Sequence, residues 1–180
     1  PADGWSFNVA DDMPTGTYQQ SEEGYRGGES DPPQGLVVAG DNWSSGGADL
    51  GVGIEVKYAG ESRAFVATPE VTSGGAPTES PEGIPSIHRG DRWFPVSIAL
   101  GEDGTATVVY DGVTIMENEP VGWEGVSDAQ IGFGARTGGA WESHWFDNVN
   151  INLSGGPIGP VTMEQQPEGV SGAAEHSQVT

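Results

Sequence analysis

The side chains in this chain that could do chemistry are carboxylates and tryptophans. The sequence has 27 Asp and Glu residues and six Trp, but only three His and no Cys. The absence of Cys excludes a thiolate nucleophile, thiolate metal ligands and a disulfide framework. Carboxylates accept hydrogen bonds from hydroxyl groups and bind hard cations, and an indole face can stack on a pyranose ring. The inventory therefore favours binding of a polar ligand or a cation.

Catalytic motifs are missing from the sequence. The three histidines, His88, His144 and His176, are scattered along the sequence. Neither a His-Glu-x-x-His nor a Gly-x-Ser-x-Gly motif occurs. Retaining glycoside hydrolysis needs two carboxyl groups about 5 Å apart, which a Glu-x-Asp-x-Glu strand would supply. The nearest string, residues 29–31, runs into Pro32-Pro33, which cannot continue a central strand. We therefore expect no enzymatic activity.

The tryptophans divide into two groups by their surroundings. Three lie in Gly-rich stretches, where they either contact a ligand or act as lids on the core; these are Trp43, Trp123 and Trp141. We expect three other large aromatic residues to be core residues, namely Trp93, Phe133 and Trp145.

The net charge limits the partners. Six Lys and Arg against 27 Asp and Glu give a formal charge of -21. Such a surface repels nucleic acids and anionic membranes, so neutral ligands or cations are the expected partners. No stretch approaches the roughly 18 apolar residues of a membrane helix, and we expect no membrane insertion.

Apolar residues recur with a period of two, which predicts an all-β domain. Alternating runs cover 5–9, 52–58 and 94–100, and no segment keeps helical spacing over three turns. The Asp-Gly pairs at 103–104 and 111–112 are typical hairpin turns, so 94–115 should form a three-stranded meander. Helix should be almost absent.

Composition divides the chain further. The stretch 68–92 is rich in Pro, Gly, Ser and Glu and offers little to bury, so we expect a long surface loop. We predict one domain over 1–153, a Gly/Pro linker over 154–160, and the start of a further module or a disordered tail over 161–180.

Three segments together resemble the bacterial-type L-type (legume-type, concanavalin A-like) lectin domain. They are Ala2-Asp3-Gly4-Trp5, Asp41-Asn42-Trp43 and the Gly-Phe-x-Ala-x-Thr-Gly string at 132–138. The expected meander is also similar to laminin G-like domains. The resemblance implies an antiparallel two-sheet jelly-roll sandwich. Because the sequence lacks an initiator Met and starts inside an expected strand, we expect the first strands upstream and an unpaired sheet edge beside Gly4.

The resemblance also implies a function. Chains of this family bind carbohydrate without turnover, which here predicts a non-catalytic module of a secreted or cell-surface multidomain protein, with a glycan and neighbouring domains as partners. The matching carbohydrate-binding positions are Asp3, Gly28, Trp43, Thr137, Gly138, Gly139 and Trp141. Two alternatives stay open: a structural or adhesive spacer that binds no glycan, and a domain similar to glycoside hydrolases.

Calcium is the cofactor that the resemblance implies. Asp41 matches a calcium-binding aspartate, Trp43 a residue whose carbonyl binds calcium, Ser45 stands where the family has Asn, and Asp49 could add a carboxylate. The family's transition-metal positions hold Ala39 and a residue near Gly51, so we expect no transition metal. The alternative is a metal-free loop in which Asp41 and Asn42 accept turn hydrogen bonds.

A second calcium position is implied at the end of the domain. Alternation over 145–153 puts Asp147 on the apolar side of an expected last strand. A buried carboxylate needs an arginine, backbone N–H groups or a metal. Asp147-Asn148 is similar to a calcium-binding pair of carbohydrate modules with a β-sandwich fold. The alternative is a bulge that exposes Asp147.

Overall fold

The structure is a computed structural model, and it describes residues 4–11, 35–43, 50–69, 80, 82–87, 93–136 and 143–152. The chain divides into two units, Pro1–Met13 with Gln19–Trp145 and Pro14–Tyr18 with Phe146–Thr180. All the strands among these described residues belong to the first unit. Within the described ranges no residue is helical, and no helix is long and apolar enough to cross a bilayer.

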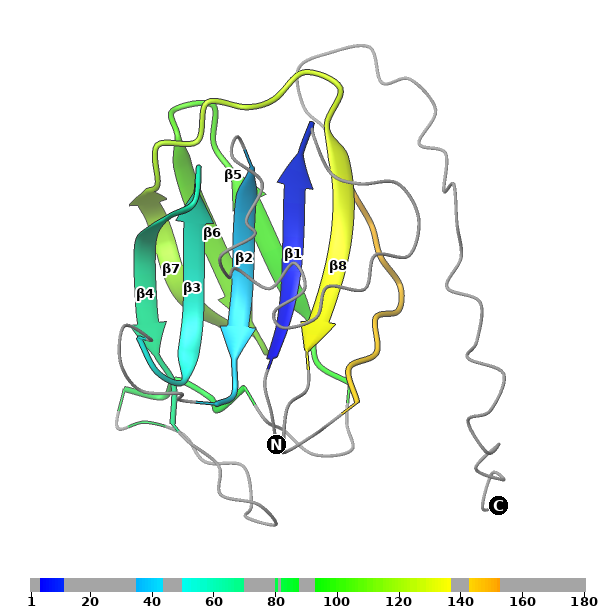
Figure 1. Cartoon of the computed structure of the whole chain (residues 1–180). Coiled ribbons are helices and arrows are strands. Elements are labelled where there is room, and N and C mark those ends of the chain that lie inside the picture. Colours follow the sequence, from blue (N-terminus) through cyan, green and yellow to red (C-terminus); the bar gives the residue numbers. More distant parts are fainter. Residues whose placement is uncertain are drawn as a thin grey trace, which may run out of the picture. The chain divides into compact units, whose positions relative to one another are not determined.

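In the part of the chain that the structure describes, eight antiparallel strands form two sheets (Figure 1). The strands are β1 (Gly4–Ala10), β2 (Leu36–Asp41), β3 (Gly53–Tyr58), β4 (Glu61–Ala67), β5 (Val96–Leu100), β6 (Thr105–Tyr110), β7 (Val113–Pro120) and β8 (Gln130–Arg136). One sheet has the order β4-β3-β2-β1-β8 and the other the order β5-β6-β7. The predicted all-β class is therefore confirmed, and so is the meander with turns at 103–104 and 111–112.

The strand that begins at Gly4 does not lie at a sheet edge. β1 is hydrogen-bonded to β2 on one side and to β8 on the other. The predicted unpaired edge beside Gly4 is therefore wrong. The reason is a long-range pairing, because β8 returns from the far end of the first unit to fill that position.

A single hydrophobic cluster joins the two sheets. The five-stranded sheet contributes Leu36, Val38 and Ile54, and the three-stranded sheet contributes Val108 and Tyr110, all of which are fully buried. These residues alternate along their strands, as period-two burial requires. The two antiparallel sheets thus share one core, as in a β-sandwich.

The stretch between Thr68 and Arg92 buries more than its composition predicts. Its described part includes Pro85, Ser86 and Ile87, all buried, and Ile87 belongs to the core cluster. The hydroxyl of Tyr110 donates a 2.8 Å hydrogen bond to the carbonyl oxygen of Ile87. The expectation of a stretch with little to bury is therefore wrong for 85–87, because a single Ile suffices to anchor the connection to the core.

Candidate functional site

One end of the five-stranded sheet brings together the segments that the sequence singled out. Because β2 and β8 are both antiparallel to β1, they end where β1 begins (Figure 1). Gly4 is paired with Asp41 on one side and with Arg136 on the other. In the sequence, Asp3 directly precedes Gly4, Asn42 directly follows Asp41, and Thr137 directly follows Arg136. The three segments therefore meet the sheet at one end, the end at which β1 begins.

Many of the predicted site residues lie outside the described residues. They are Asp3, Gly28, Ser45, Asp49, Thr137, Gly138, Gly139 and Trp141. Three predicted site residues lie within the described residues. Asp41 and Trp43 belong to the predicted calcium loop, and Asp147 is the second predicted calcium position.

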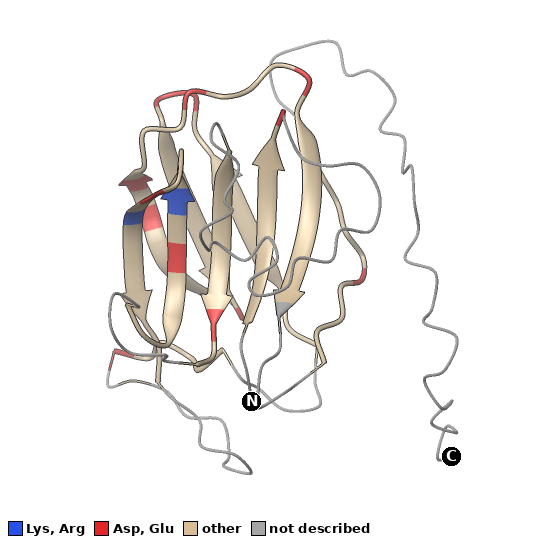
Figure 2. Ribbon diagram, in the orientation of Figure 1, with Lys and Arg blue, Asp and Glu red and all other residues tan. Residues whose placement is uncertain are grey.

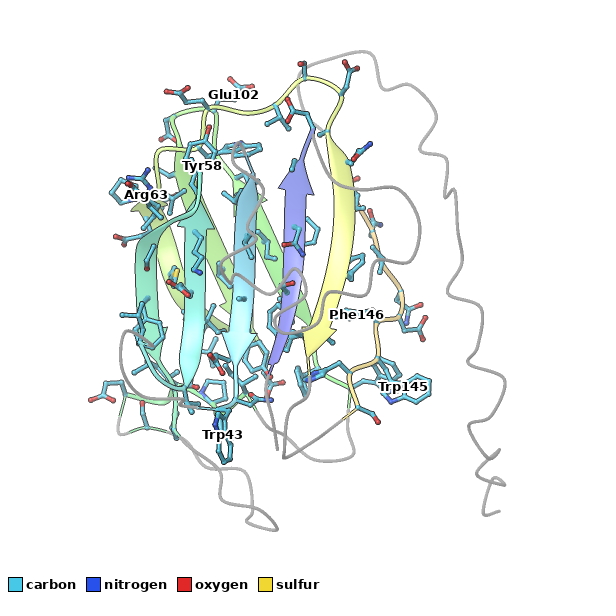
Figure 3. All side chains as sticks on the ribbon, in the orientation of Figure 1. Trp43, Tyr58, Arg63, Glu102, Trp145 and Phe146 are labelled. Atoms are coloured by element: carbon cyan, nitrogen blue, oxygen red, sulfur yellow. The ribbon has the colours of Figure 1, made fainter. Side chains whose placement is uncertain are left out.

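Asp41 and Trp43 form a tight turn directly after β2. The backbone N–H of Trp43 donates a 2.8 Å hydrogen bond to Oδ1 of Asp41. This is the hydrogen bond of an Asx turn, in which a short carboxylate satisfies the N–H group two residues further on. The Trp43 side chain is 46% exposed and lies beyond the end of β2 (Figure 3). The turn thus presents an indole to solvent from a rigid strand end.

The described oxygens at this turn are too few to make a calcium site by themselves. Calcium takes roughly six to eight oxygen ligands. Of the predicted ligands, the described residues include only the Asp41 carboxylate and the Trp43 carbonyl. No group of three His, Cys, Asp or Glu side chains suited to a metal occurs among the residues that the structure describes. The Asp41 carboxylate holds the turn through Oδ1.

Asp147 is exposed, and the prediction of a buried carboxylate on a last strand is wrong. Residues 143–152 contain no strand. Asn148 has a φ of 52°, which interrupts an extended chain. The Asn148 N–H donates a 2.7 Å hydrogen bond to Oδ1 of Asp147. The exposure that the alternative expected is thus present, but it arises from this local turn and not from a bulge in a strand.

The expected assignment of the aromatic residues is largely reversed. Trp93, Phe133 and Trp145 are 64%, 41% and 76% exposed, so their prediction as core residues is wrong. Trp123 instead packs against the core cluster, edge-on to Tyr58 with ring centroids 5.7 Å apart. Of the two loop tryptophans that the structure describes, Trp123 is a lid on the core, whereas Trp43 is exposed to solvent.

The exposure of Trp93 has a signal in the sequence. Phe94, Ile98 and Leu100 pack against the core, and they share one phase of the alternation. Trp93 is out of phase with all three, so a strand places it on the opposite side. The period-two pattern alone would have excluded Trp93 from the core.

Among the charged positions that the structure describes, acidic residues are more numerous than basic ones (Figure 2). On the ribbon of Figure 2, blue marks only positions on β3 and β4, where Arg63 forms an ion pair of 2.9 Å with Glu61. At the β5–β6 turn, hydrogen bonds from the Thr105 hydroxyl and backbone N–H lower the pKa of Asp103. The turn and Tyr58 lie at the end of the sheets opposite Trp43, as Glu102 and Tyr58 show in Figure 3.

Comparison of the chain with protein-family models, with curated proteins and with solved structures finds no match.

Proposed function

We propose that this chain is a non-catalytic carbohydrate-binding module with a jelly-roll fold, carried by a secreted or cell-surface protein. One observation carries the proposal: Gly4 pairs with both Asp41 and Arg136. This pairing supports a shared site for the segments that contain Asp3, Trp43 and Thr137. The exposed indole of Trp43 supplies a stacking surface at the same end of the sheet.

The proposed chemistry divides the work between a carboxylate and an indole. Asp3 accepts hydrogen bonds from two sugar hydroxyls, while Trp43 covers an apolar face of the pyranose ring. The segment from Thr137 to Trp141 shapes the rim. Because the chain carries a charge of -21, the glycan is neutral. No step of this proposal depends on calcium.

The affinity of a single site should be modest. Few groups converge on an open surface, so we expect a Kd near the millimolar range, which corresponds to about -4 kcal/mol. Repetition of such modules in one protein would raise the avidity.

A glycan array followed by titration of each hit tests the proposal. We expect Asp3→Ala to abolish binding and Trp43→Ala to weaken it about tenfold, which corresponds to the loss of one aromatic contact of about 1.4 kcal/mol. Trp93→Ala is the matched control, because it removes a more exposed indole that is not part of the proposed site. Absence of binding to every glycan, or full binding by Asp3→Ala and Trp43→Ala, would leave the spacer function as the better account.

A further inference from the structure

The connection between β7 and β8, residues 121–129, passes from the three-stranded sheet to the five-stranded sheet (Figure 1). One acceptor holds its first part, because the carbonyl oxygen of Gly104 accepts hydrogen bonds from the N–H groups of Val121 at 3.0 Å and Gly122 at 2.9 Å. Near its other end, Asp128 has a φ of 57°, which is uncommon for a residue other than glycine. The conformation of this connection therefore depends on the contacts at its two ends.

Carboxylates lie on both sides of the contact at Gly104. Glu102 and Asp103 belong to the β5–β6 turn and directly precede Gly104. The connection that is hydrogen-bonded to Gly104 continues into Glu124, two residues beyond Gly122. All three acidic side chains are exposed. The hydrogen bonds to Gly104 therefore bring the negative charges of two separate segments close together.

Two more carboxylates lie at the β8 end of the connection. Ala10 is paired with Gln130, where β1 ends and β8 begins. Asp11 directly follows Ala10, and Asp128 stands two positions before Gln130, so the antiparallel register places both just beyond the ends of these strands. Both are exposed. The five carboxylates are called the acidic group below: Asp11, Glu102, Asp103, Glu124 and Asp128.

No positive charge is paired with the acidic group. None of these five described residues forms an ion pair. Figure 2 shows red but no blue along the connection and the β5–β6 turn. Arg63 is instead bound to Glu61 at 2.9 Å, and Lys57, the only Lys in the sequence, lies on β3. Hydrogen bonds from Thr105 lower the pKa of Asp103, which keeps this carboxylate charged.

The range of repulsion between these charges depends on ionic strength. The screening length is about 30 Å at 10 mM salt and about 3 Å at 1 M salt. In dilute salt, each member of the acidic group is repelled by the other four and by the rest of a chain whose formal charge is -21. In concentrated salt, repulsion acts only between groups in near contact. The connection therefore experiences a force in dilute salt that has nearly vanished in 1 M salt.

We propose that the connection 121–129 is a salt-sensitive joint, which repulsion within the acidic group releases from Gly104 in dilute salt and which screening by cations closes. The joint needs no bound ion, because screening acts through the mobile ions of the solution. Its release would withdraw the Trp123 ring from Tyr58 and loosen the start of β8. The two sheets are thus joined most firmly at high ionic strength, and this property is independent of glycan binding.

Hydrogen exchange of the whole chain in the presence of EDTA tests this proposal. We expect exchange of the Val121 and Gly122 amides, which are bonded to Gly104, to slow about tenfold between 10 mM and 1 M NaCl. Choline chloride should have the same effect as NaCl, because screening depends on ionic strength and not on the identity of the cation. EDTA removes divalent ions, so an effect of calcium stays separate.

Two double variants with the same change in net charge locate the repulsion. Glu102→Gln with Glu124→Gln neutralises two members of the acidic group. We expect it to slow exchange of the two amides about threefold in 10 mM NaCl, and to reduce the response to 1 M NaCl by the same factor. Glu55→Gln with Glu117→Gln is the matched control, because it removes the same charge from β3 and β7. Its exchange should respond to NaCl as that of the original chain does.

The melting temperature gives a second readout, which does not require a folded chain in 10 mM NaCl. It should rise with NaCl in the original chain and in both double variants, and least in Glu102→Gln with Glu124→Gln. Exchange of the two amides that is independent of NaCl would overturn the proposal, and so would equal salt responses of the two double variants in both readouts. An effect of NaCl that choline chloride does not reproduce would also overturn it, because it would show a bound sodium ion in place of screening.

Discussion

The indole ring of Trp5 on β1 lies directly over Gly40 on β2. A Cβ atom at position 40 would lie 2.6 Å from both Cε2 and Nε1 of the ring. The two residues are also paired in the sheet register. Gly40 therefore allows β2 to run under the buried indole and to end in the Asp41–Trp43 turn.

Gly40→Ala should destabilise the fold. We expect a loss of about 1–3 kcal/mol, because the methyl group must displace a buried ring in a packed core. Denaturant unfolding would measure it. Trp5→Phe in the same background should recover part of the loss, since the smaller ring leaves room. Strict additivity of the two substitutions would show that the contact does not limit residue 40.

The carboxylate of Asp41 should stabilise the turn through its oxygen and not through its charge. Asp41→Ala removes the acceptor for the Trp43 N–H and should cost about 1 kcal/mol in thermal or denaturant unfolding. Asp41→Asn keeps an acceptor oxygen in the same place and is the matched control, with a smaller loss than Asp41→Ala. Equal losses in the two variants would contradict the role of the hydrogen bond.

Calcium binding at Asp41 depends on the charge, so the same pair of variants tests it differently. We expect millimolar Ca²⁺ to raise the Tm relative to EDTA, by about 1.4 kcal/mol in stability at ten times the Kd. Asp41→Asn should lose this response while keeping the turn. Asp147→Ala tests the second predicted position separately. Superimposable melting curves in Ca²⁺ and EDTA would remove both positions from consideration.

Asp103 should titrate below the usual Asp range. The Thr105 hydroxyl at 2.7 Å and the Thr105 backbone N–H at 3.3 Å both donate to its Oδ1 and lower its pKa. A depressed pKa in the folded state stabilises the fold above the pKa of the unfolded chain, and this contribution is lost as pH falls through the folded value. An NMR titration should show the Asp103 pKa rising in Thr105→Val and unchanged in Thr114→Val. An unshifted Asp103 in the original chain would contradict this.

The strands could be predicted because their signals are local. Alternation in 5–9 and 94–100 requires only neighbouring residues, and an Asp-Gly pair sets its own turn. The structure accordingly contains β1, β5 and the β5–β6–β7 meander where the sequence placed them. The turn at Asp41 follows from local chemistry as well, since an Asx turn spans only three residues.

Features that depend on distant contacts could not be predicted in the same way. The position of β1 between β2 and β8 is fixed by pairing with residues more than a hundred positions away. The exposure of Phe133, which is 41%, depends on residues outside β8, so no pattern within β8 predicts it. Trp145 lies just before a predicted strand that residues 143–152 do not form, because Asn148 has a left-handed backbone conformation that interrupts the alternation.

The pairing of β1 with β8 also has a consequence for the order in which this protein can fold. The Asn8 side chain donates to the Gly132 carbonyl, and these two residues are 124 positions apart. Closing so long a loop costs conformational entropy before the contact can stabilise the fold. Sheets with such distant pairings therefore fold slowly. During synthesis β1 leaves the ribosome well before β8, its second neighbour in the sheet. Until β8 emerges, β1 lacks its partner on one side, so the five-stranded sheet can be completed only after β8 has been synthesised.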